Sequence, residues 1–104
     1  MHYALLVHEH IDWTHRGAYM HARHAITVEV ANDAISDPQR VVIDPDYNSS
    51  SGHSIRIIGY SRLVNALVTV IVLEDEGKVY GVNGWIANAK DRQIYGKEGD
   101  DGQD

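Results

Sequence analysis

The sequence predicts an α+β domain in which two short helices precede a mostly antiparallel four-stranded sheet and one last helix. Three observations predict this class. Apolar residues recur at helical spacing between positions 28 and 35, and β-branched runs alternate with turn residues from position 40 to position 82. The chain has 104 residues, of which 43% are hydrophobic, so it is long enough and apolar enough for one folded core.

The two predicted helices come before the sheet. Thr14 is a candidate N-cap for the first helix, which we expect to end at Ala25. Thr27 is a candidate cap for the second helix, whose apolar face spans residues 28–35, and Asp37-Pro38 is expected to stop it. Apolar residues four positions apart in this second helix predict that one side of it is buried.

Turn-forming residues separate the predicted strands. We expect a short strand or strand-like entry at 11–13, strands at 40–44, 55–60, 66–73 and 78–82, and a last helix over 88–95. The almost unbroken apolar run 66–73 predicts the central strand, buried on both faces. Asn83-Gly84 is expected to break the strand that precedes the last helix.

Charge and composition limit the classes of function. The chain carries 15 acidic and 9 basic residues, and residues 98–104 are expected to form a disordered acidic tail after a domain at 1–97. A near-neutral domain can bind nucleic acid through a local basic face, but not as a strong non-specific binder. Without Cys, disulfides and thiolate metal sites are excluded. We expect a cytoplasmic protein with no membrane contact, because no signal peptide or long apolar run is evident.

Four short motifs follow one another between residues 11 and 96. They are Trp13 with Arg23-His24-Ala25-Ile26-Thr27, Asp37-Pro38 with Asp44-Pro45-Asp46, Ile58-Gly59-Tyr60-Ser61, and Asp91-Arg92 with Tyr95. In this order and spacing they resemble the BrnT-type toxins, which are the RelE-like ribonuclease partners of bacterial type II toxin–antitoxin pairs. The chain departs from the family at Ser54, where an Arg is usual, and at Trp85-Ile86-Ala87-Asn88, where an Arg-Lys-Ala-Thr segment is usual.

The resemblance implies a RelE-like fold and a toxin that cleaves mRNA without a metal or other cofactor, and thereby inhibits translation. It also implies a cognate antitoxin protein that neutralises the toxin. We expect RNA and this antitoxin as partners, in an assembly that is a homodimer or a heterotetramer of two toxin–antitoxin pairs.

Metal-independent RNA cleavage needs a base, an acid and a cation that stabilises the phosphorane. Arg56 is a candidate phosphate binder, because it is a lone cation in an Ile-rich strand; the alternative is an ordinary outward-facing strand position. His53 is a candidate for proton transfer, and the alternative is a plain loop residue. Arg92 and Tyr95 share a helix face, where they serve either the substrate or the packing of the helix.

Three further residues are candidates for RNA binding. Arg62 follows a strand end, and Asn83 precedes a glycine at which the backbone can turn and expose Trp85. An exposed Trp could stack on a base, whereas a buried one would belong to the core. His24 matches the family's His between helices; it is either catalytic or a cap for the preceding helix.

Six of the seven histidines lie in the first quarter of the chain. The spacings His8-x-His10 and His21-x-x-His24 permit Zn²⁺ or Ni²⁺, but no complete metal motif is present. The alternative is a set of scattered surface histidines. Three hypotheses therefore stand: an RNA-cleaving toxin, a non-catalytic binding protein on the same scaffold, and a metal-binding protein that uses the N-terminal histidines.

Overall fold

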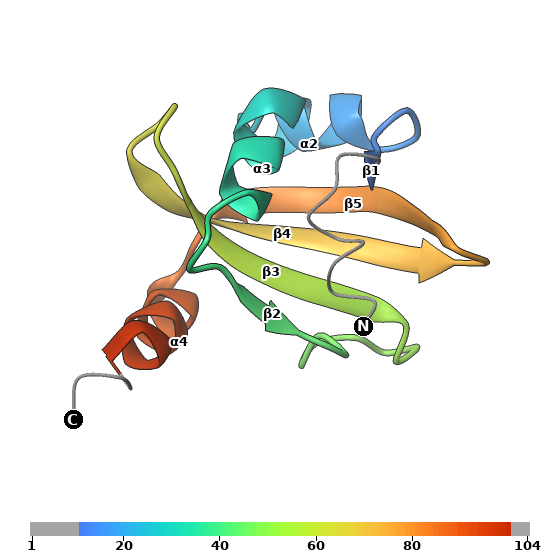
Figure 1. Cartoon of the computed structure of the whole chain (residues 1–104). Coiled ribbons are helices and arrows are strands. Elements are labelled where there is room, and N and C mark those ends of the chain that lie inside the picture. Colours follow the sequence, from blue (N-terminus) through green and yellow to red (C-terminus); the bar gives the residue numbers. More distant parts are fainter. Residues whose placement is uncertain (1–10, 101–104) are drawn as a thin grey trace.

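The computed structural model describes residues 11–100, and the side chains of residues 11–97. Its elements are β1 (Ile11–Asp12), α2 (Gly17–His24), α3 (Val28–Ile35), β2 (Val41–Ile43), β3 (Ser54–Ser61), β4 (Ala66–Asp75), β5 (Lys78–Ile86) and α4 (Ala89–Asp100). The strands form one sheet in the order β1-β5-β4-β3-β2 (Figure 1). The predicted α+β class is confirmed.

The sheet differs from the prediction in strand number and direction. It has five strands and is mixed, because β1 pairs in parallel with β5 through Ile11 and Asp12. The other neighbouring strands pair antiparallel, as expected. β4 lies in the middle of the order, which confirms the predicted central strand.

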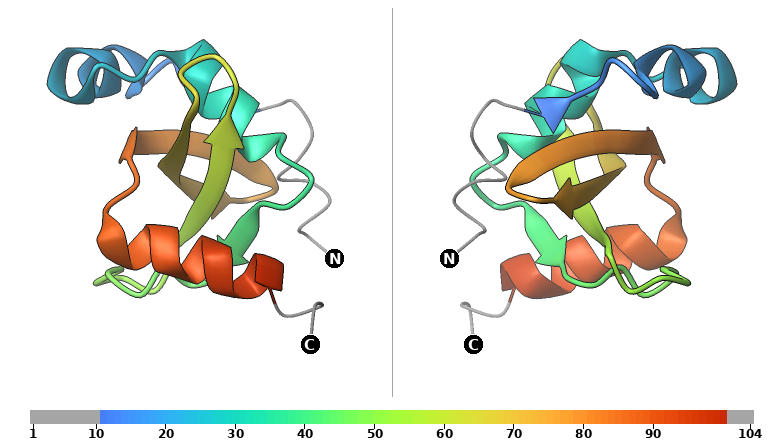
Figure 2. Two further views of the ribbon diagram at one scale, coloured as in Figure 1. Left: turned by 90° about the vertical axis from the view of Figure 1, so that its left-hand side faces the viewer. Right: turned by 90° about the vertical axis from the view of Figure 1, so that its right-hand side faces the viewer.

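Helices cover both faces of the sheet. Figure 2 shows α2 and α3 on one side of the strands and α4 on the other. α2 contacts β5, α3 contacts β3 and β4, and α4 contacts β3 and β2. The main core lies under α2 and α3, where Met20, Ala34, Ile57 and Val70 are fully buried.

The second helix forms as its sequence predicts. The hydroxyl of Thr27 accepts a hydrogen bond from the backbone N–H of Val30 (3.1 Å), which satisfies a donor that the first turn leaves free. Ala25 ends the preceding helix in a left-handed conformation with φ of 60°, and its N–H donates to the carbonyl of His21. Both local predictions are confirmed.

The predicted cap of the first helix is wrong. α2 begins at Gly17, and its N-cap residue is Arg16, which makes no capping hydrogen bond with its side chain. Thr14 instead donates from its backbone N–H and its hydroxyl to the carboxylate of Asp12. This carboxylate holds Thr14 in a turn before the helix, a role that Asp side chains commonly take.

The predicted break at Asn83-Gly84 is also wrong. β5 continues to Ile86, and the missing side chain of Gly84 makes room for packing rather than for a turn. A Cβ atom there would lie 2.9 Å from Sδ of Met20, which belongs to α2. The last helix runs beyond the predicted residue 95 to Asp100, so the predicted acidic tail begins inside α4, and residues 101–104 lie outside the described part.

Candidate functional site

Arg56 lies inside the protein. Its exposed fraction is 2%, its Nε donates to Oδ1 of Asp46 (2.7 Å), and its Nη1 donates to Oδ2 of Asp91 (2.6 Å). The hydroxyl of Thr69 donates to the same Asp91 oxygen (2.7 Å). The alternative of an ordinary outward-facing position is therefore wrong. Two carboxylates already neutralise the guanidinium, and a phosphate could reach it only by displacing them.

The charges of this buried ion-pair site stabilise one another. Burial acts most strongly and opposes ionisation of Asp91, but hydrogen bonds from Tyr47, Thr69 and Arg56 outweigh it and lower the pKa of Asp91. Burial likewise opposes the charge of Arg56, and the two carboxylates outweigh it and raise the pKa of Arg56. Asp91 and Arg56 are consequently both charged at neutral pH.

An aromatic ring closes the buried ion-pair site from outside. Tyr47 donates its hydroxyl to Asp91, and its ring centroid lies 4.2 Å from Cζ of Arg56 and 3.9 Å from Nζ of Lys90. Burial, followed by the bond to Asp91, raises the pKa of Tyr47 to about 12. The site therefore fastens the loop after β2 and the start of α4 onto the sheet, and it places Lys90 at the surface.

The other predicted catalytic residues have separate surroundings. His53 is exposed in the loop before β3. Nη1 of Arg92 donates to the carbonyl of Ala87 (2.8 Å), which secures the first turn of α4. The hydroxyl of Tyr95 donates to Oδ2 of Asp37 (2.7 Å), and burial, then this carboxylate, raises the pKa of Tyr95 to about 12. These contacts favour the structural alternatives for Arg92 and Tyr95.

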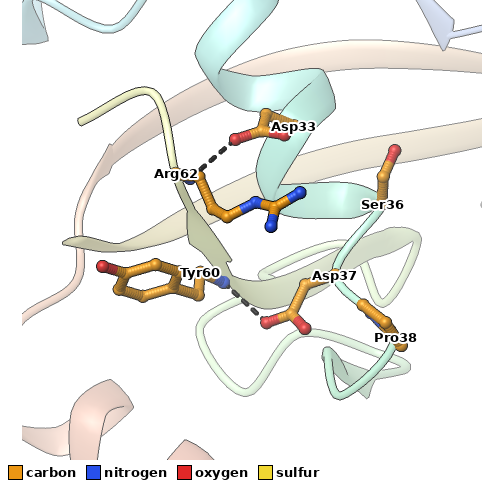
Figure 3. Close-up of a pocket in the computed structure, with 6 residues that line it drawn as sticks. All are labelled: Asp33, Ser36, Asp37, Pro38, Tyr60 and Arg62. Atoms are coloured by element: carbon orange, nitrogen blue, oxygen red, sulfur yellow. Dashed lines mark hydrogen bonds between the residues drawn. The ribbon is translucent and has the colours of Figure 1, made fainter. Parts of the chain in front are cut away.

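Arg62 lines a pocket of about 370 Å³ that lies beside the end of β3. The pocket is lined by Asp33, Ser36, Asp37, Pro38, Tyr60 and Arg62. In Figure 3 the guanidinium of Arg62 lies between the side chains of Asp33 and Asp37. Both carboxylates accept backbone N–H groups of the β3 end, Asp33 from Arg62 and Asp37 from Tyr60. This acidic surrounding is unfavourable for a phosphate, so the pocket does not support the predicted RNA-binding role of Arg62.

A different surface gathers cations and rings. Residues 13–28 and residues 77–90 contain no Asp or Glu, and the parts of them that form α2 and β5 lie side by side. We name this surface the β5–α2 face and define it by the cations and rings that it carries. They are His15, Arg16, Tyr19, Arg23, His24, Lys78, Tyr80 and Trp85.

Rings and cations of the β5–α2 face contact one another along β5. The ring centroids of His15 and Tyr80 are 5.9 Å apart, and Nζ of Lys78 lies 5.6 Å from the Tyr80 ring. Further along, the rings of His24 and Trp85 are 5.6 Å apart. Trp85 also lies 5.6 Å from Cζ of the buried Arg56, which helps to fix its position. The strand thus presents two aromatic platforms, each beside a histidine of the α2 segment.

Several cations of this face are accessible. Arg16 and Arg23 are exposed, and Nε of Arg16 donates to the carbonyl of Val82 (3.2 Å), which ties the start of α2 to β5. Arg16 also stacks on the ring of Tyr19, 4.2 Å away. Lys78 is partly neutralised by Asp12, 3.5 Å away. Accessible cations beside aromatic platforms are the combination that single-stranded nucleic-acid sites use.

Two of the three predicted RNA-binding residues lie at this face. Trp85 is half-buried at its edge, and Asn83, two residues before it on β5, is half-buried with its side-chain oxygen on the N–H of Gly84. The sequence interpretation did not identify Arg16, Arg23 or Tyr80 as binding residues. Their signal was present in the sequence as two long segments without acidic residues in a chain of net charge −6.

No protein-family model matches the chain, and a search of curated proteins finds no match. Within the described part, no helix is long and apolar enough to cross a membrane. Among residues 11–100, no three His, Asp or Glu side chains gather in a way that could hold a metal ion. The predicted pair His8 and His10 lies outside the described residues.

Proposed function

We propose that the protein binds single-stranded RNA across the β5–α2 face, as the RNA-directed toxin of a toxin–antitoxin pair that acts in the cytoplasm. The observation that carries the proposal is the packing of the two acid-free segments against each other. This packing concentrates cations and rings on one surface of an otherwise acidic protein. The resemblance to BrnT-type toxins supports RNA as the nucleic acid.

The geometry favours a single strand over a duplex. Tyr80 and Trp85 offer rings on which unpaired bases can stack, and each such contact stabilises a complex by about 1–3 kcal/mol. Arg16 and Arg23 can neutralise about two phosphates, which predicts a salt slope of about −1.4 for a single strand. This modest slope suits a protein whose overall charge repels nucleic acid.

Affinity measurements on matched variants test this proposal. Fluorescence anisotropy with a labelled oligouridylate should show that Trp85→Ala weakens binding by about tenfold, and that Arg23→Ala weakens it and reduces the salt slope by about 0.7. Arg62→Ala removes an exposed cation from outside the β5–α2 face, and it should leave the affinity unchanged. Equal losses for the variants at 23 and 62 would show that the face has no special role.

A metal-independent ribonuclease is the second candidate function. It is favoured by the placement of His24 against the ring of Trp85, next to Arg23, because an imidazole there could take the 2′-hydroxyl proton of a stacked nucleotide. Incubation of RNA with the folded protein in EDTA should then give cleavage, and His24→Asn should abolish cleavage while RNA still binds. If RNA that is bound to the wild-type protein stays intact, the ribonuclease function is contradicted and the non-catalytic binding function stands.

The proposed antitoxin is tested separately. Co-expression of the chain with the product of its neighbouring gene should give a complex, in which the partner blocks RNA binding. Light scattering distinguishes a homodimer from a heterotetramer of two toxin–antitoxin pairs. A chain that stays monomeric and does not bind the neighbouring gene product would contradict this part of the proposal.

A further inference from the structure

The turn between β3 and β4 presents apolar side chains to solvent. Leu63 is 62% exposed and Val64 is 40% exposed, and the nearby Tyr60 is 39% exposed. The hydroxyl of Tyr60 donates to the side chain of Asn65, which keeps its ring beside the turn. Two consecutive exposed aliphatic residues next to a ring form an apolar patch of the kind that marks a protein contact. We name Tyr60, Leu63 and Val64 the hairpin tip.

The hairpin tip adjoins an acidic surface. α3 contains Glu29 and Asp33 but no Lys or Arg, and Asp37 follows it. Asp33 accepts the backbone N–H of Leu63 (3.4 Å), so the acidic pocket and the hairpin tip are contiguous. The C-terminal end of the α3 dipole adds negative potential at this place.

Both carboxylates of the pocket are ionised at neutral pH. The hydroxyl of Ser61 acts most strongly on Asp33 and, with the backbone N–H groups of the turn, lowers its pKa. Burial acts most strongly on Asp37 and opposes its charge, but Tyr95 and two backbone N–H groups outweigh burial and lower the pKa of Asp37. The residues that line the pocket comprise two carboxylates and one cation, Arg62, and Arg40 also lowers the pKa of Asp37 from outside the lining.

We propose that the hairpin tip and the acidic pocket together form a docking site for a protein segment that presents a Lys or Arg side chain next to aliphatic residues. The aliphatic residues would cover Leu63 and Val64, and the cation would enter between Asp33 and Asp37. Charge complementarity decides the class of partner, because a basic segment compensates the two carboxylates of the pocket and an acidic one adds negative charge beside them. The site is distinct from the β5–α2 face and does not depend on RNA binding.

Replacement of Arg62 distinguishes the binding of a cation from the binding of an anion in this pocket. The side chain of Arg62 lines the pocket and acts electrostatically on Asp33 in the free protein, so an incoming cation competes with it (Figure 3). Replacement of Arg62 by Ala should therefore strengthen the binding of a basic segment several-fold. If the pocket instead took an anion, Arg62 would hold that anion, and the same replacement would weaken binding.

The test is a selection from a random dodecapeptide display library on the immobilised full chain. The double variant Leu63→Ser/Val64→Ser serves for counter-selection, because both side chains are exposed and their loss should not unfold the protein. We expect the retained peptides to carry Lys or Arg beside Leu, Ile or Val. The double variant should bind the best of them at least about tenfold more weakly than the wild type, since it removes two apolar contacts.

Affinities of the best peptide for the single variants decide the outcome. Arg62→Ala should bind it several-fold more tightly, and Arg23→Ala, a matched cation on the β5–α2 face, should bind it as the wild type does. The proposal is overturned if the selection yields no peptides or acidic ones, or if Arg62→Ala weakens binding. It is also overturned if sedimentation shows a homodimer that the double variant dissociates, because a second copy would then occupy the site.

Discussion

Arg56→Ala should destabilise the protein severely. The change leaves two carboxylates without their cation, and these are buried side chains, since Asp91 is 0% exposed and Asp46 is 7% exposed. Asp91 would keep the hydroxyls of Tyr47 and Thr69, but hydroxyls cannot cancel its charge. Breaking a buried ion pair by removing one partner typically costs about 3–5 kcal/mol. For a domain of this size the melting temperature should fall by at least about 12 °C.

Urea unfolding followed by circular dichroism measures this cost. Lys90→Ala is the matched control, because Lys90 stacks on the same Tyr47 ring from the exposed side and should contribute less than about 1 kcal/mol. Equal stability of Arg56→Ala and the wild type would refute the assignment of Arg56 to a structural ion-pair site. Arg56 would then again be a candidate phosphate binder. In that case Arg56→Ala should reduce toxicity without reducing stability.

Three further predictions concern stability. The carboxyls of Asp33 and Asp91 have folded-state pKa values below the ordinary 3.8. Their contribution to stability is therefore complete above that pH and is lost as the pH falls further. The free energy of unfolding, measured in an acid titration, should decline below about pH 4. Gly81→Ala should cost at least about 2 kcal/mol in urea unfolding, because its Cβ would lie 2.3 Å from the Trp13 ring. Tyr95→Phe should lower the melting temperature and cost about 1.5 kcal/mol, because it removes a hydrogen bond to a carboxylate. A flat acid titration, a stable Gly81→Ala or an unchanged Tyr95→Phe would each contradict the corresponding contact.

Local patterns predicted most of the elements. The helix Val28–Ile35, its Thr27 cap and the central strand all rest on residues that are close in sequence, where spacing and propensity act directly. The short strand at 11–13 was predicted, but its parallel pairing with β5 was not, because pairing depends on residues distant in sequence. The full length of β5 was also missed. Gly84 has the sequence pattern of a turn residue, and only its contact with Met20 in the fold shows that it makes room for packing.

The candidate site was less predictable for a physical reason. A cation within an apolar strand has the same local pattern whether it faces solvent or pairs with distant carboxylates. Asp46 is ten residues away and Asp91 is 35 residues away, and only the fold brings both to Arg56. The β5–α2 face similarly needs two distant segments to meet, although the lack of acidic residues in each is visible in the sequence.

The most direct test of the central claim is an NMR titration of the ¹⁵N-labelled chain with a short oligouridylate. We predict that amide shift changes concentrate in residues 13–28 and 77–90 and that the indole N–H of Trp85 shifts strongly, whereas that of the buried Trp13 does not. Shift changes centred on α3 and the hairpin tip, or no saturable change at all, would contradict RNA binding at the β5–α2 face.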